Sequence, residues 1–96
     1  MSEIVEQAVA ILNDKMGSDG FDGVAKFVLT GEGSIVIDRA GARVSDDDAE
    51  VTLTASAETF QRILEGDLNP TAAFMTGRLS VDGNMGMALK LSSVLA

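Results

Sequence analysis

Residues 56–91 restrict the fold more than any other stretch of this chain, because glycines divide them into short apolar segments. The serine that opens the stretch is a favoured helix N-cap residue, and three apolar residues after it share one helical face: Phe60, Ile63 and Leu64. Gly66 predicts the end of that helix, because glycine accepts the left-handed conformation of a C-terminal cap. Asn69 and Pro70 predict a second helix, since proline in the first turn loses no hydrogen bond. Gly77 predicts its end.

The second half of the stretch predicts a strand and a last helix. Residues 78–82 alternate apolar and polar as a strand does, and Gly83 with Asn84 predicts a turn into a helix over 84–95. More apolar residues occur here than three short elements need to pack against one another. That excess is a first indication of function.

The N-terminal half predicts one helix followed by four strands. Residues 2–16 carry a broad apolar stripe, with Ser2 as the candidate cap and five polar residues facing water: Glu3, Glu6, Gln7, Asn13 and Asp14. Alternation of period two predicts strands at 24–30, 34–38, 42–45 and 50–55. The loops between these strands are too short for helical crossovers, so we expect an antiparallel meander. Residues 1–96 are then one α+β domain, with helices covering a five-stranded, mostly antiparallel sheet.

The net charge of −8 and the absence of cysteine and histidine exclude several classes of function. Nucleic-acid binding requires clustered Lys and Arg, and this chain has seven of them spread along an acidic sequence. The same charge opposes stable docking on anionic membranes. Without Cys or His, the commonest nucleophile–base pairs and metal ligands are missing. We therefore expect no enzyme activity, no metal site and no cofactor.

Two motifs have simpler interpretations than ligand binding. Gly31-Glu32-Gly33 is followed by a predicted strand and not by the helix N-terminus that a phosphate loop needs, which favours a hairpin turn. The acidic run Asp46-Asp47-Asp48 lacks the spacing of a calcium loop, which favours a solvated turn. Neither motif predicts a site.

Three of the five methionines lie close together in the sequence: Met75, Met85 and Met87. Periodicity favours an ordinary core for them. Methionine also lines apolar pockets that adapt to differently shaped ligands. Composition does not decide between these two interpretations.

No targeting or membrane-spanning segment is evident. No apolar run approaches the ~20 residues that span a membrane, and the acidic N-terminus has no basic region ahead of an apolar core. The last three residues, Val94-Leu95-Ala96, are not the peroxisomal Ser-Lys-Leu signal. We expect a cytoplasmic protein with no stable membrane insertion.

Longer motifs run through nearly the whole chain. The first strands contain Gly20-Phe21-Asp22-Gly23-Val24-x-Lys26-Phe27 and Gly33-Ser34-Ile35-x-Ile37-Asp38. The later half contains Asp48-x-x-Val51-Thr52-Leu53-Thr54-x-Ser56-x-Glu58, then Leu64-x-Gly66-x-Leu68-x-Pro70, then Ala73-Phe74-Met75-Thr76-Gly77-Arg78-Leu79-x-Val81-x-Gly83-Asn84-Met85. On these motifs the chain resembles the sterol carrier protein 2 family, the small intracellular lipid-binding domains.

The resemblance implies a five-stranded sheet covered by helices, with an apolar tunnel between them. It also implies fatty acids, fatty acyl-CoA, sterols or phospholipids as ligands. The chain departs from the family pattern in two places. Ile35 and Ile37 stand where the second strand often carries an aromatic residue, and the C-terminal segment that usually closes the tunnel does not follow Ala96. Both departures bear on the size and closure of the tunnel.

We therefore expect one apolar volume between helices and sheet that binds a lipid or fatty acyl ligand. The residues expected to line it are Phe27, Ile35, Phe60, Leu64, Phe74, Met75, Leu79, Met85, Met87 and Leu91. Each methylene that leaves water contributes ~0.8 kcal/mol, so a long chain should bind with little selectivity for its length. Arg39, Arg43 and Arg78 are the cations available for a polar head at the mouth.

Two other functions remain open at this point. The first is an interaction module whose apolar surface packs against itself or against a partner protein. The second is an accessory domain that presents lipid to an enzyme on another chain. If no segment follows helix 84–95, four of its side chains cannot all face one small core: Met87, Leu91, Val94 and Leu95. A second copy of the chain, related by a twofold axis, is then the expected cover. Added salt should strengthen this homodimer, because the charge of −8 per chain opposes association.

Overall fold

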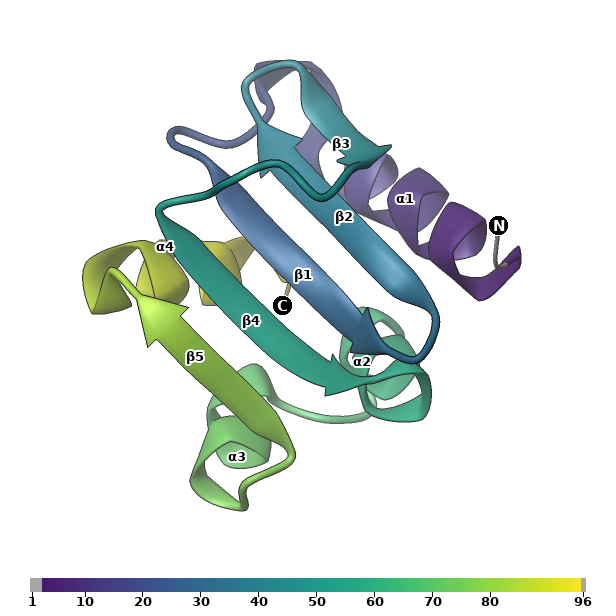
Figure 1. Ribbon diagram of the computed structural model, residues 1–96, viewed down its shortest axis with the longest axis vertical. Coiled ribbons are helices and arrows are strands. Elements are labelled where there is room, and N and C mark those ends of the chain that lie inside the picture. The colour runs from purple at the N-terminus through teal and green to yellow at the C-terminus, as the bar shows by residue number, and fades with distance from the viewer. Residues whose placement is uncertain (1–2, 96) are drawn as a thin grey trace.

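The computed structural model describes residues 3–95, in which helices gather on one face of a five-stranded sheet (Figure 1). In chain order the elements are α1 (Glu3–Met16), the 3-10 helix η1 (Gly17–Asp19), β1 (Ala25–Thr30), β2 (Gly33–Asp38), β3 (Gly41–Val44), β4 (Val51–Ser56), α2 (Ala57–Leu64), α3 (Pro70–Met75), β5 (Leu79–Gly83) and α4 (Met85–Leu95). Apart from η1, which falls in a predicted loop, they match the predicted helices and strands within about two residues at each end. Ser2, the predicted first cap, lies outside the described residues.

The strand order is β3-β2-β1-β4-β5, and the central pair of β1 with β4 is parallel. The other three pairings are antiparallel, so the predicted α+β class with a mostly antiparallel sheet is confirmed. The predicted meander of the first four strands is wrong, because β4 pairs with β1 and not with β3.

The link 45–50 explains this difference. It crosses the face of the sheet that lies opposite the helices (Figure 1), and Lys26 Nζ on β1 lies 3.4 Å from the Oδ1 of Asp46 in the link. The three strand spacings from β3 to β4 amount to ~14 Å, whereas six extended residues reach ~20 Å. An extended link of this length therefore reaches from β3 to β4 without a helix. The prediction assumed that such a crossing requires one.

The core lies between the sheet and the helices. Alternate residues of β1 and β4 point toward the helices and are buried: Ala25, Phe27, Leu29, Val51, Leu53 and Ala55. The rings of Phe27 and Phe60 on α2 pack with their centroids 4.7 Å apart and their planes at 50°, an arrangement that suits aromatic quadrupoles. Leu12 of α1 and Leu91 of α4 are fully buried in the same cluster. The central strands thus hold α1, α2 and α4 to one sheet.

Side-chain caps fix where the short helices begin. The predicted caps Ser56 and Asn69 are confirmed, since both side-chain oxygens accept backbone N–H groups of the first turn. The shortest of these bonds, 2.8 Å, joins the Thr71 N–H to Asn69 Oδ1. Such caps satisfy N–H groups that have no partner inside the helix, so α3 forms although it has only six residues.

Asn13 does not simply face water, as the sequence predicts, but closes part of the sheet edge formed by β3. The Ala42 N–H donates to Asn13 Oδ1 at 2.8 Å, and Asn13 Nδ2 donates to the Ala42 carbonyl oxygen at 3.1 Å. The side-chain amide replaces the strand neighbour that an edge residue lacks. Helical periodicity places Asn13 on the polar side of α1 but carries no information about the strand beside it.

Candidate functional site: an apolar groove

An apolar groove opens to solvent between α3, β5 and α4, at the edge of the sheet opposite β3. Its volume is about 290 Å³, near the lower end of the roughly 300–1,000 Å³ typical of ligand pockets. The lining comes from four elements: Leu53 of β4; Pro70, Thr71, Phe74 and Met75 of α3; Leu79 and Val81 of β5; and Met85, Ala88, Leu89, Ser92 and Leu95 of α4.

The side of β5 that faces the groove follows from strand alternation. Leu79 is buried and Val81 half-buried on the groove side, while Ser80 and Asp82 fall on the opposite face. The predicted alternation of this segment therefore assigns its apolar residues to the groove and its polar residues to solvent.

Four large apolar side chains remain exposed around the groove. On α3, Phe74 is 44% and Met75 79% exposed, and on α4, Met85 is 51% and Leu89 68% exposed. We call these four residues the rim. Ala73 of α3 is fully buried, so this one-and-a-half-turn helix uses its small residue against the core and leaves its bulky ones outside. Clustered exposed apolar side chains on a monomer mark a binding surface.

The junction of β5 and α4 sets the wall of the groove. Gly83 has a φ of +108° and lies opposite Val51 in the ladder. The Asn84 N–H donates to the Glu50 carbonyl oxygen at 3.0 Å, and Asn84 Oδ1 accepts the Met87 N–H at 3.1 Å. These two bonds tie the first turn of α4 to the start of β4, which fixes the direction in which α4 leaves the sheet.

A second contact ties α4 to the loop before β1. Lys90 Nζ donates to the Asp22 carbonyl oxygen at 3.2 Å and lies 5.8 Å from the ring centroid of the buried Phe21. Asp22 also accepts a hydrogen bond from Arg39 at 3.1 Å. Hydrogen bonds from Arg39 and then from Lys90 hold the pKa of the Asp22 carboxyl below its ordinary value of 3.8. The stability that the ionised Asp22 carboxylate gives the fold through Arg39 and Lys90 is therefore fully present above pH 3.8. It is lost only as the pH falls through the lowered pKa, so it is complete at neutral pH.

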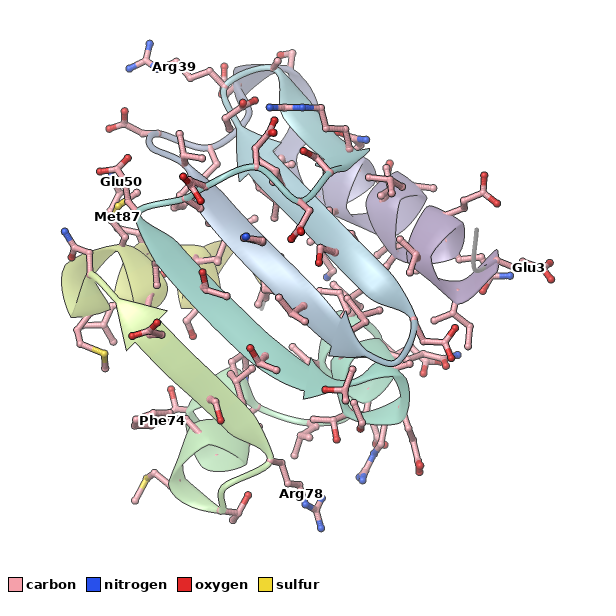
Figure 2. All side chains as sticks on the ribbon, viewed as in Figure 1. Glu3, Arg39, Glu50, Phe74, Arg78 and Met87 are labelled. Carbon is pink, nitrogen blue, oxygen red and sulfur yellow. The ribbon has the colours of Figure 1, made fainter. Side chains whose placement is uncertain are left out.

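None of the described residues that line the groove is charged, and its polar side chains are the hydroxyls of Thr71 and Ser92. The three cations that the sequence offers for a polar head lie elsewhere. Arg39 is at a far corner of the molecule and the Arg78 side chain extends away from Phe74 (Figure 2). Arg43 pairs with Asp38 of β2 at 2.9 Å. The groove is thus an uncharged site in an acidic chain.

The ten residues expected to share one volume are divided by the structure. Four line the groove: Phe74, Met75, Leu79 and Met85. The other six belong to the buried core: Phe27, Ile35, Phe60, Leu64, Met87 and Leu91. Phe60 and Leu64 also border a separate hollow of about 90 Å³ between α1 and α2. The ten residues therefore do not all line one cavity.

The expectation that four apolar side chains of α4 cannot all face one core is wrong. Met87, Leu91 and Leu95 are buried and Val94 is half-buried, so the core accommodates the residues that were expected to need a cover. Leu89 was not singled out from the sequence, although it follows Met85 by four positions, one helical turn. Because α4 is apolar on nearly every side, its periodicity does not show which side faces the sheet.

Within residues 3–95, no three His, Cys, Asp or Glu side chains are grouped so as to hold a metal ion. No helix of this part of the chain is both long enough and apolar enough to cross a membrane.

Curated relatives match this chain along almost its whole length. Residues 8–96 match the model of the SCP-2 sterol transfer family. Hydroxysteroid dehydrogenase-like protein 2 from Bos taurus is 32% identical over 105 residues, and that from Homo sapiens is 30% identical; each match covers 98% of this chain and 25% of the relative. The chain therefore spans about a quarter of the length of these relatives.

Solved structures share the fold. Sterol Carrier Protein-2 from Aedes aegypti, in complex with the C16 fatty acid palmitate, has a TM-score of 0.81 and 26% identity, covering 100% of this chain and 97% of that one. Sterol carrier protein domain 2 of Helicoverpa armigera has a TM-score of 0.73 and 28% identity, covering 96% and 85%. The resemblance seen in the motifs is confirmed, and this chain belongs to the SCP-2 sterol transfer family.

Proposed function

We propose that this chain binds a lipid and holds its hydrocarbon part in the groove between α3, β5 and α4. The observation that carries the proposal is an open groove lined by apolar side chains and two hydroxyls, with four exposed apolar residues around it. Membership of the SCP-2 sterol transfer family supports it. The Aedes aegypti protein supports it as well, because its structure holds a C16 fatty acid.

The energetics favour long chains without selecting one length. Each methylene that moves from water into the groove contributes ~0.8 kcal/mol, while association and chain ordering together cost roughly 4 kcal/mol or more. A short chain therefore binds weakly and a long one binds well. Two ligands that differ by one methylene differ only severalfold in affinity.

We propose that the lipid contacts Phe74, Met75, Leu79 and Met85 from the predicted set, together with Leu89. All five line the groove, and four of them form the exposed rim. The six core residues of the predicted set act on binding only through the stability of the sheet and helices. All six are buried, and none of them lines the groove.

Replacing Leu89 with glutamate should weaken the binding of a pyrene-labelled hydrocarbon probe at least about tenfold, because the new carboxylate loses water when a chain enters the groove. Leu89 is largely exposed, so the variant should fold normally. Val44→Glu is the matched control, since Val44 is an exposed apolar residue on β3 at the opposite edge of the sheet. Fluorescence titration gives the affinities, and circular dichroism melting checks the fold of both variants.

Equal affinity of the wild type and Leu89→Glu, or an equal loss in both variants, would contradict the proposed site. A wild type that binds no probe but sediments as a dimer would favour the alternative function, in which a second copy of the chain covers the rim. That dimer should strengthen with added salt, because two chains of charge −8 repel each other. It should also dissociate in Leu89→Glu and persist in Val44→Glu.

We also propose that the isolated chain carries lipid without altering it. The sequence contains no His or Cys, and none of the described residues lining the groove is ionisable. Palmitoyl-CoA incubated with the purified chain should remain intact, as mass spectrometry of the mixture measures directly. Turnover that survives purification and disappears on replacing one carboxylate or lysine would overturn this expectation.

An accessory role is compatible with lipid binding. The chain matches a quarter of the length of the relatives named hydroxysteroid dehydrogenase-like protein 2. That partial match supports a role as a domain that presents lipid to an enzyme. The cytoplasmic location stays a prediction from the sequence.

A further inference from the structure

Most cations of the chain are already paired with carboxylates. Of its seven Lys and Arg residues, five form ion pairs within residues 3–95: Lys26, Arg39, Arg43, Arg62 and Lys90. Lys15 and Arg78 form none with the described residues. Lys15 lies in the last turn of α1, which packs at the β3 side of the sheet. Arg78 lies between α3 and β5, and its side chain extends away from Phe74 (Figure 2).

The polar groups that the groove does offer are the hydroxyls of Thr71 and Ser92. Within residues 3–95 neither hydroxyl forms a hydrogen bond to another protein group. Each can donate one hydrogen bond and accept others. A ligand in the groove therefore meets neutral hydrogen-bonding groups and no positive charge.

We propose that the preferred ligand of this groove has an uncharged polar head, a hydroxyl or an ester, and not a carboxylate or a phosphate; this rests on the lipid binding proposed above. An anionic head at the groove gives up water without gaining a cation, and it approaches a chain of net charge −8. A hydroxyl or ester has no charge to desolvate, and Thr71 or Ser92 can satisfy it. The proposed head group differs from the carboxylate of the palmitate that the Aedes aegypti structure holds.

Competition among ligands of equal chain length tests the head group. Dodecanol, methyl dodecanoate and dodecanoate would each displace a pyrene-labelled hydrocarbon probe at pH 8, where the carboxylate is ionised. The two neutral ligands should displace the probe at concentrations at least about tenfold lower than dodecanoate does. Dodecanoate that competes as well as dodecanol would overturn the preference while leaving lipid binding intact. A wild type that binds no probe at all would overturn both proposals.

The dodecanoate anion is more soluble in water than the neutral ligands, which by itself weakens its binding to any apolar site. Three variants separate this effect from the contribution of the protein. Ser92→Lys places a cation on the lining, so the affinity for dodecanoate relative to methyl dodecanoate should rise about tenfold. Thr71→Lys serves the same purpose if Ser92→Lys unfolds, because Thr71 is exposed. The double variant Thr71→Val, Ser92→Ala should weaken dodecanol a few-fold relative to the hydrocarbon probe. No gain for dodecanoate relative to methyl dodecanoate in a folded lysine variant would contradict the proposal.

Discussion

Replacing Phe27 with alanine should lower the free energy of unfolding by about 3–5 kcal/mol. The side chain is 1% exposed and packs on the ring of Phe60, so truncation removes an aromatic pair and leaves a cavity at the centre of the sheet. Small domains are stable by only about 5–15 kcal/mol, so this variant should be close to unfolding. Urea denaturation followed by circular dichroism measures the loss, since the chain has no tryptophan to report by fluorescence.

The same replacement at Phe74 should give the opposite pattern and serves as the matched control. Phe74 is half-exposed and lines the groove, so Phe74→Ala should cost less than about 1 kcal/mol of stability but weaken probe binding several-fold. Equal losses of stability in the two variants would contradict the packing described here. A folded Phe27→Ala that loses binding, beside a Phe74→Ala that keeps it, would move the lipid site from the groove to the core.

Gly83→Ala should destabilise the chain by roughly 2–6 kcal/mol, because strain and overpacking act together. The φ of +108° is unfavourable for alanine, and a Cβ at this position would collide with the Glu50 carbonyl oxygen and lie 3.1 Å from the Cα of Val51. Both contacts are backbone atoms, of Glu50 and Val51 where the neighbouring strand begins, and they cannot move aside as a flexible side chain does. Thermal unfolding followed by circular dichroism measures the loss.

Gly31→Ala is the control for Gly83→Ala. Gly31 also has a positive φ, +79°, but a Cβ there has no heavy atom within 4 Å. It should therefore carry only the backbone penalty, about 1–2 kcal/mol. If both variants lose the same stability, the close approach of β5 to β4 contributes nothing, and the junction does not fix α4 as described.

The sequence predicted the elements well and their pairing less well. Caps such as Ser56 and Asn69 and strand alternation are local signals, and local signals locate helices and strands. The position of β4 beside β1 depends on which strand surfaces bury most apolar area, and loop length alone does not show it. Asn13 is the same kind of error, since its partner Ala42 is distant in the sequence.

The lining of the groove was predicted in part for a related reason. Apolar periodicity identifies residues that leave water, but Phe27 and Phe74 satisfy it equally, and only the fold buries one and exposes the other. The motif around Phe74, Met75 and Leu79 lies on α3 and β5, two of the elements that line the groove. Leu89 went unnoticed because α4 has apolar residues on nearly every side, which hides the side that faces the groove.

The parallel pairing of β1 with β4 has a consequence for the order of folding. β1, β2 and β3 pair through short hairpins. The central pair instead joins Ala25 to Val51, and β2, β3 and the link 45–50 all lie between these two residues in the sequence. Closing a longer loop costs more chain entropy, and non-local pairings slow the folding of a domain. The two hairpins should therefore form early, and the half of the chain that builds the groove should become ordered only once β4 has docked on β1. Refolding kinetics monitored at α3 and α4 would then report the last step of folding.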